Sequence, residues 1–138
     1  MQFNAKNNPR VIIVQTLYSK LYNNEEKLEF PKHRFRKFIK DIVTGTIERD
    51  NVIDDEISKH LSKDINLKNL DKVFQIILKT GIFEFMYKPK TPVKIIIKEY
   101  LNASNFFLDD GQTKYLNALL DNIGNKLRSP NAWNSFNK

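Results

Sequence analysis

The sequence predicts an all-α protein, and three observations lead to this class. Apolar residues recur at spacings of three and four through most of the chain, as they do on one face of a helix. Only four glycines and five prolines interrupt the 138 residues, which suits helices joined by short loops. The one strand-like run, Ile95 to Ile97, follows a helix-start signal and has i+4 partners after it, so we expect helix there too.

Length and composition favour one domain over residues 1–138. A chain of this size buries an apolar core without disulfides, and its lack of cysteine excludes both disulfides and cysteine-ligated metal. The polar ends, residues 1–8 and 129–138, are expected to be mobile. The start of the chain does not resemble a signal peptide, and no apolar run is long enough to cross a bilayer. We therefore expect a cytoplasmic protein.

The first helix is expected from Pro9 to Tyr22. Proline suits the first helical position, and Ile13, Leu17 and Leu21 repeat at i+4. The polar residues 23–32 that follow predict the longest internal loop.

The second and third helices are expected after Pro31 and around residues 53–61. The apolar stripe of the second consists of Phe35, Phe38, Ile39, Ile42, Val43 and Thr46. In the third, Ile53, Ile57 and Leu61 repeat at i+4. The acidic triplet 54–56 is interpreted as its N-terminus, where carboxylates favour the helix dipole.

The fourth helix has the clearest pattern. Its apolar positions hold a helical period over four turns: Leu70, Val73, Phe74, Ile77, Leu78, Gly81, Ile82 and Phe85. So wide a stripe predicts a central helix that neighbours contact from more than one side. Glu84 lies inside this pattern. We expect it either at the one exposed edge of the helix or as a contact for a cation of a partner.

The last two helices begin with recognisable start signals. Thr91 followed by Pro92 is interpreted as a cap with proline in the first turn. Asp109 and Asp110 open the sixth helix, whose buried face includes Leu116 and its i+4 repeats. The six helices divide into an early and a late group of three.

No catalytic constellation is recognisable. His33 and His60 have no metal-ligand spacing, and neither a glycine-rich phosphate loop nor a GxSxG elbow occurs. The sequence thus favours a binding protein over an enzyme, with no catalytic residue, no metal and no cofactor.

Charge points to an anionic partner. The formal net charge is +7 and the pI is about 9.5, a balance that favours nucleic acid, although surplus lysine can also serve only to solvate the surface. Basic residues gather at the second helix start: Lys32, Arg34, Arg36, Lys37 and Lys40. A second basic group surrounds the loop into the fifth helix: Lys88, Lys90, Lys94 and Lys98.

The order of short motifs resembles one known family. Residues 10–19, RVIIVQTLYS, are similar to an arginine followed by "AxQALYS", and residues 42–45, IVTG, to "LLxGV". Residues 76–85 resemble "AILRxAxYEL", and residues 114–121, KYLNALLD, resemble "KFVNGVLD". These motifs are those of the NusB family of transcription antitermination factors, and the similarity runs from Arg10 to Arg128.

The resemblance implies a NusB-like fold of two packed three-helix bundles and a non-enzymatic role. Proteins of this family pair with the small-subunit ribosomal protein NusE and bind single-stranded boxA RNA. They thereby help RNA polymerase to read through terminators in ribosomal RNA operons. Relatives occur as monomers and as dimers, so a homodimer stays open. The alternative function is a protein-interaction module that kept the fold without sequence-specific RNA binding.

The resemblance also implies site residues. The positions that match the family's RNA contacts are Lys6, Arg10, Gln15, Tyr18, Lys114, Asn117 and Asp121. The positions that match its NusE side are Glu84, Tyr87, Lys88 and Lys94. The chain departs from the family at its N-terminus, where the arginine cluster is reduced to Lys6 and Arg10. That loss should weaken RNA binding and its dependence on salt.

Overall fold

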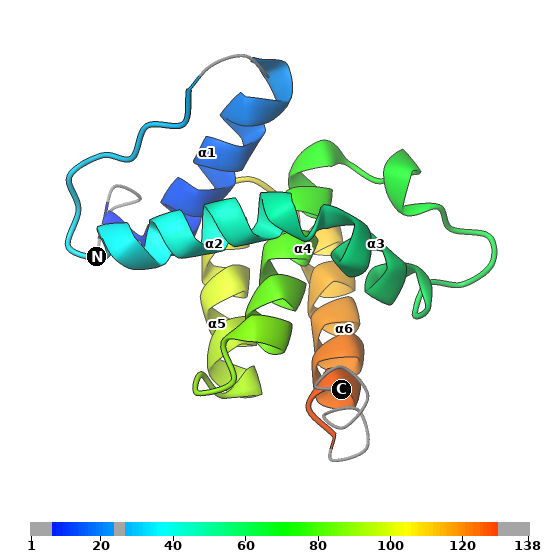
Figure 1. The fold of residues 1–138 in the computed structure, drawn as a ribbon. Helices are drawn as coiled ribbons and strands as arrows, with labels where there is room; N and C mark the ends of the chain where they lie inside the picture. The colour runs from blue at the N-terminus through cyan, green and yellow to red at the C-terminus, as the bar shows by residue number, and fades with distance from the viewer. Residues whose placement is uncertain (1–6, 24–26, 130–138) are drawn as a thin grey trace.

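The computed structural model describes residues 7–23 and 27–129, so Lys6 and most of both polar ends lie outside the described part. No described residue belongs to a strand, which confirms the all-α class. The helices are α1 (Pro9–Tyr22), α2 (Arg36–Glu48), α3 (Asp50–Ser58), α4 (Lys72–Tyr87), α5 (Val93–Ser104) and α6 (Asp110–Leu127), with a 3₁₀ turn η2 at Leu67–Asn69 before α4 (Figure 1).

Helix α4 joins the two groups of three helices. It packs against each of the other five: α5 and α6 lie along it in one group, and α1, α2 and α3 cover it from the other side (Figure 1). Residues 74–78 and 80–86 are all buried. The predicted central helix is therefore confirmed. Because it has neighbours all round, its apolar pattern is wider than the stripe of a surface helix.

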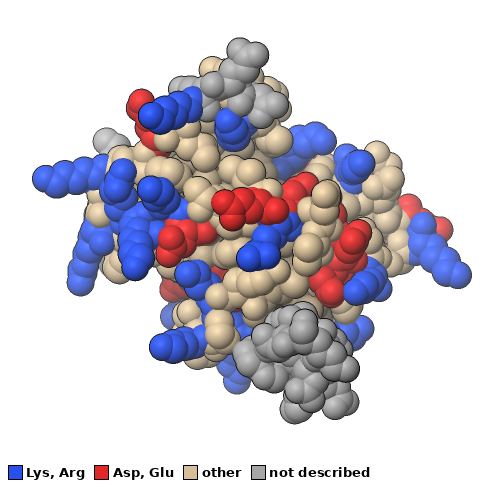
Figure 2. Space-filling model, in the orientation of Figure 1, with Lys and Arg blue, Asp and Glu red and all other residues tan. Residues whose placement is uncertain are grey.

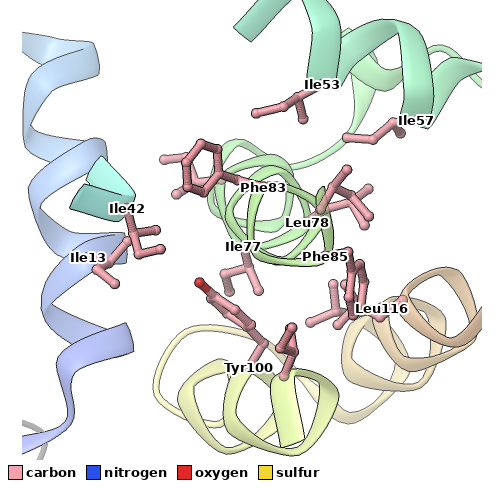
Figure 3. Close-up of a cluster of buried hydrophobic side chains, with 14 of the residues drawn as sticks. Ile13, Ile42, Ile53, Ile57, Ile77, Leu78, Phe83, Phe85, Tyr100 and Leu116 are labelled. Atoms are coloured by element: carbon pink, nitrogen blue, oxygen red, sulfur yellow. The ribbon is translucent and has the colours of Figure 1, made fainter. Parts of the chain in front are cut away.

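The core is continuous across both groups. Figure 3 shows Ile77, Leu78, Phe83 and Phe85 of α4 pointing to different neighbours, with Tyr100 of α5 below them. Ile77 and Tyr100 have no exposed surface. This arrangement holds the surface faces of α1, α5 and α6 in fixed positions.

Two glycines let aromatic rings of α4 approach neighbouring helices. A Cβ built on Gly124 of α6 would lie 2.6 Å from the ring carbon Cζ of Phe85. A Cβ on Gly45 of α2 would meet the ring of Phe83 still more closely. These crossings therefore need a residue without a side chain.

Two of the predicted helix starts are confirmed. The Asn8 carboxamide oxygen accepts the amides of Arg10 and Val11 at 2.9 and 3.2 Å, and α1 has the predicted bounds. At α6, the Asp109 carboxylate accepts the Gln112 amide at 2.7 Å, and the Gln112 side chain accepts the Asp109 amide at 3.1 Å. This reciprocal pair is a capping box, which satisfies two amides at the helix start.

Several details of the sequence interpretation were wrong. Helix α3 ends at Ser58, before Leu61, and α4 begins at Lys72, after Leu70. Phe35 is the N-cap of α2, with 45% of its surface exposed, and does not join the buried stripe. Helix α3 begins at Asp50, so the acidic triplet lies inside it, where Asp54 pairs with Lys79 of α4 at 3.0 Å. The N-cap of α5 is Pro92, without a side-chain cap from Thr91.

No helix within residues 7–23 and 27–129 is both long enough and apolar enough to cross a membrane.

Candidate functional site

The outward face of α1 carries two of the predicted RNA residues. Gln15 is exposed, and Tyr18 keeps 39% of its surface exposed with its ring centroid 4.8 Å from that of Tyr22. These three side chains line a hollow whose apolar wall includes Val73 and Phe107. We call this hollow the Tyr18 groove. An open aromatic side chain beside a carboxamide can stack on an unpaired base and bond its edge.

A second hollow, of about 350 Å³, lies between α5 and α6. It is lined by Lys94, Ile97, Lys98, Leu101, Asn102, Asn117 and Asp121, and we call it the α5–α6 groove. It contains two of the predicted RNA residues, Asn117 and Asp121. Lys114 is exposed three positions before Asn117, on the same face of α6.

The chemistry of the α5–α6 groove suits a polar ligand with negative charge. The carboxamides of Asn102 and Asn117 both donate and accept hydrogen bonds, and Lys94 and Lys98 each add a cation. Asp121 is the one negatively charged residue in the lining of this groove. Its carboxylate accepts a hydrogen bond from the side-chain amide of Asn125 at 3.0 Å. Such a mixture fits base edges together with phosphates.

The Tyr18 groove and the α5–α6 groove share no lining residue. The predicted RNA residues within the described part therefore form two groups: Gln15 with Tyr18, and Lys114 with Asn117 and Asp121. The structure brings together the members of each group at a separate hollow.

Arg10 and Glu84 face each other inside the protein. The Arg10 guanidinium donates to both carboxylate oxygens of Glu84, from Nε at 3.0 Å and from Nη2 at 2.7 Å. The side chain of Arg10 is 10% exposed and that of Glu84 is 0% exposed. The expected exposed edge for Glu84 is therefore wrong: its carboxylate has an internal cation.

Aromatic rings complete the environment of Arg10. Its guanidinium carbon lies 5.0 Å from the ring centroid of Phe38 and 5.3 Å from that of Tyr100, within the range of cation–π attraction. Burial alone lowers the pKa of Arg10, but its bond to Glu84 and nearby negative charge outweigh this and leave the pKa raised. Burial, with the charge of Glu84, also raises the pKa of Tyr100 well above its ordinary value. Arg10 thus stays charged and serves an internal contact.

The residues that match the NusE side are not all neighbours. Lys88 lies 3.7 Å from the Asp41 carboxylate of α2, and the Tyr87 ring lies 4.9 Å from Phe83 and 4.5 Å from the guanidinium of Arg49. Both are at the end of α4. Lys94 instead lines the α5–α6 groove with two residues of the RNA group.

Sequence reasoning missed several contacts. Asn102 lines the α5–α6 groove beside Lys98, which was predicted only as a member of a basic group; the spacing of four from Lys94 to Lys98 and from Lys98 to Asn102 was the available signal. Arg128 caps α4, donating to the carbonyl oxygens of Phe85 at 2.7 Å and of Lys88 at 3.0 Å. No local pattern predicts that contact, because Arg128 and its partners lie 40 or more positions apart in the sequence.

Fold and site together define an all-helical protein with a central helix and polar surface hollows, and the described residues contain no group of three His, Asp or Glu side chains able to hold a metal. Within that class, the chain belongs to the NusB family, whose sequence model matches residues 1–125.

Curated relatives and solved structures agree with this membership. Transcription antitermination protein NusB of Bradyrhizobium diazoefficiens is 31% identical over 66% of this chain and 55% of its own length. The protein of the same name from Sinorhizobium fredii is 28% identical over 92% and 90%. The first of these matches thus spans little more than half the relative's length.

Two solved structures share the fold. T. maritima NusB superposes with a TM-score of 0.77 at 19% identity, over 97% of this chain and 99% of that one. A chain from a crystal structure of antitermination factors NusB and NusE in complex with dsRNA gives 0.73 at 17% identity, over 91% and 99%. This confirms the NusB-like fold.

Proposed function

We propose that this protein is a transcription antitermination factor that binds boxA-type RNA together with NusE and supports transcription of ribosomal RNA. The observation that carries the proposal is the α5–α6 groove, which places Asn117 and Asp121 beside two lysines in a chain of this family. The relatives are named antitermination proteins, and one matching structure contains NusB, NusE and RNA.

In this mechanism the protein positions RNA and does no chemistry on it. Lys94, Lys98 and Lys114 neutralise phosphates, and Asn117 reads a base edge. Tyr18 and Gln15 hold a second unpaired base in the Tyr18 groove. NusE docks at the end of α4, where Tyr87 and Lys88 are half-buried. Arg10 acts indirectly, because its guanidinium is committed to Glu84.

The test is RNA affinity measured by fluorescence anisotropy with the host's NusE present. Asn117→Ala should weaken boxA-type RNA binding by a factor corresponding to about 1–2 kcal/mol, the worth of a hydrogen bond to a charged or base group. Asn122→Ala is the matched control, since Asn122 is exposed on the same helix outside the groove.

Three outcomes separate the alternatives. Failure of wild-type protein with NusE to bind boxA-type RNA at low salt contradicts the proposal. Binding of NusE combined with equal affinity for boxA and scrambled RNA favours an interaction module without sequence preference. The burial of Arg10, which removes one N-terminal cation from the surface, is the observation that keeps this second function in view.

A further inference from the structure

The start of α2 carries a basic surface that neither groove uses. It consists of Lys32, Arg34, Arg36, Lys37 and Lys40, all exposed, and we call it the α2 basic surface. Residues 27–40 hold six Lys and Arg against the single acid Glu29, a net +5 in a chain of net +7. Two further acids, Glu25 and Glu26, precede this segment in the sequence. Figure 2 shows blue atoms gathered at the left, over the start of α2, and red atoms nearer the middle.

The lysines of this surface form no ion pairs within the described part of the chain. None of Lys32, Lys37 and Lys40 pairs with an acid of the described residues, whereas Lys59, Lys79 and Lys88 elsewhere do. Within the described residues, the side chain of Arg36 bonds no acid; its Nε donates to the carbonyl oxygen of a loop residue, Phe30, at 3.4 Å. Keeping like charges this close costs free energy, which an anionic ligand would relieve.

An aromatic ring stands among these cations. Phe35 is 45% exposed, with the guanidinium of Arg34 at 5.4 Å and the ring of His33 at 5.9 Å. Cations alternating with an open aromatic ring are the pattern by which proteins hold single strands, since the cations follow the phosphates and the ring stacks on a base. An acidic protein partner would use the cations but would not need the ring.

The surface is continuous with the Tyr18 groove. A hollow of about 540 Å³ lies between α1 and residues 27–33. Its charged lining consists of Lys20, Lys27 and Lys32 with one acid, Glu29, and His33 also lines it. Gln15 and Ser19 of α1 line both this hollow and the Tyr18 groove. A strand that leaves the Tyr18 groove can therefore cross α1 at Gln15 and reach the α2 basic surface.

We propose that the α2 basic surface, with the ring of Phe35, is a second RNA contact that holds single-stranded RNA flanking the boxA-type segment. The contact is to phosphates and a stacked base, so it has no sequence preference. It rests on the proposed function, because the flanking strand must first be anchored at the two grooves.

The experiment compares two RNAs: a short boxA-type oligonucleotide, and the same RNA extended on either side by about ten uridines, the order of a single-strand site. Full-length protein with NusE is titrated at several salt concentrations. The extension should raise affinity about tenfold at low salt. The triple variant K32Q/K37Q/K40Q should lose that gain and lower the salt slope by about 2, at about 0.7 per phosphate.

The matched control is K63Q/K68Q/K126Q, which removes the same charge from three exposed lysines elsewhere: in the loop after α3, in η2 and in the last turn of α6. It should keep the gain from the extension. Phe35→Ala should lose part of the gain without changing the salt slope, because stacking is not electrostatic. Melting curves should match wild type for every variant, since each altered side chain is exposed.

Each outcome decides one point. Absence of any boxA-type binding overturns the proposed function itself. Binding of the short RNA with no gain from the extension, or equal loss in both triple variants, overturns this inference alone. Loss of NusE capture by K32Q/K37Q/K40Q with RNA affinity unchanged would assign the surface to a protein partner and likewise overturn it.

Discussion

Arg10 shows how the same residue type can serve a surface or an interior. Its position matches a family RNA contact, yet its guanidinium lies between two aromatic rings and bonds Glu84 through two nitrogens. Two charges taken out of water cost several kcal/mol, which their geometry repays only while both are present. The pair therefore links α1 to the last turn of α4 and helps to hold the outward face of α1 in place.

Glu84→Met should be strongly destabilising, by about 3–5 kcal/mol, because Arg10 is left buried without a counter-charge. The double variant R10M/E84M should recover most of that loss, since no buried charge remains. Urea unfolding followed by circular dichroism measures both values. Additive losses in the double variant would contradict the internal-pair interpretation.

The double variant R10M/E84M also shows whether Arg10 contacts RNA itself or only stabilises the position of α1. Its RNA affinity should stay within about twofold of wild type if Arg10 acts only through α1. A larger loss in a protein that still unfolds cooperatively would assign Arg10 to the RNA contact itself.

At the scale of elements, the helix crossings depend on small residues as much as on apolar stripes. The ring of Phe85 in α4 packs against Gly124 of α6, and the ring of Phe83 packs against Gly45 of α2. Side-chain volume at these crossings sets how far α6 and α2 stand from α4. The α5–α6 groove depends on that spacing, because α6 forms one of its walls.

Gly124→Ala should destabilise the protein by about 1–3 kcal/mol through overpacking, although alanine is the better helix former. Gly111→Ala is the matched control within the same helix. Its added Cβ meets only a carboxylate oxygen of Asp109 at 3.5 Å, an ordinary contact, so it should be neutral or slightly stabilising. In thermal melts, the melting temperature should fall for Gly124→Ala and should stay unchanged or rise for Gly111→Ala. Equal shifts would mean that the crossing tolerates a methyl group.

At the scale of the whole molecule, one core supports both groups of helices. Ile77 has no exposed surface and lies where α4 meets its neighbours (Figure 3). A single charge placed there has no partner and no water. The two grooves and the α2 basic surface all depend on this core. Disrupting the core should therefore abolish binding of both RNA and NusE.

Ile77→Asp should abolish the cooperative melt, because a buried unpaired carboxylate costs several kcal/mol, a large part of the stability of a small domain. Ile95→Asp is the control. Ile95 is 45% exposed on α5, so the same substitution should cost about 0.5 kcal/mol or less. A cooperative melt of the Ile77→Asp protein near the wild-type temperature would contradict the single-core description.

Local patterns were enough to predict which segments are helices. The bounds of α1, the capping box of α6 and the wide apolar stripe of α4 follow from interactions within a few residues, and these are present in the sequence itself. The ordered motifs also predicted the family, which the match over residues 1–125 confirms.

Tertiary packing alone decided which polar residues reach the surface. Glu84 turns inward because Arg10, 74 positions earlier, meets it across two helices. Asn102 joins Asn117 only because α5 and α6 pack side by side. The periodicity of apolar residues predicts which residues share a face of one helix. Which face meets another helix, and which charges meet there, depends on contacts between distant segments that no local pattern contains.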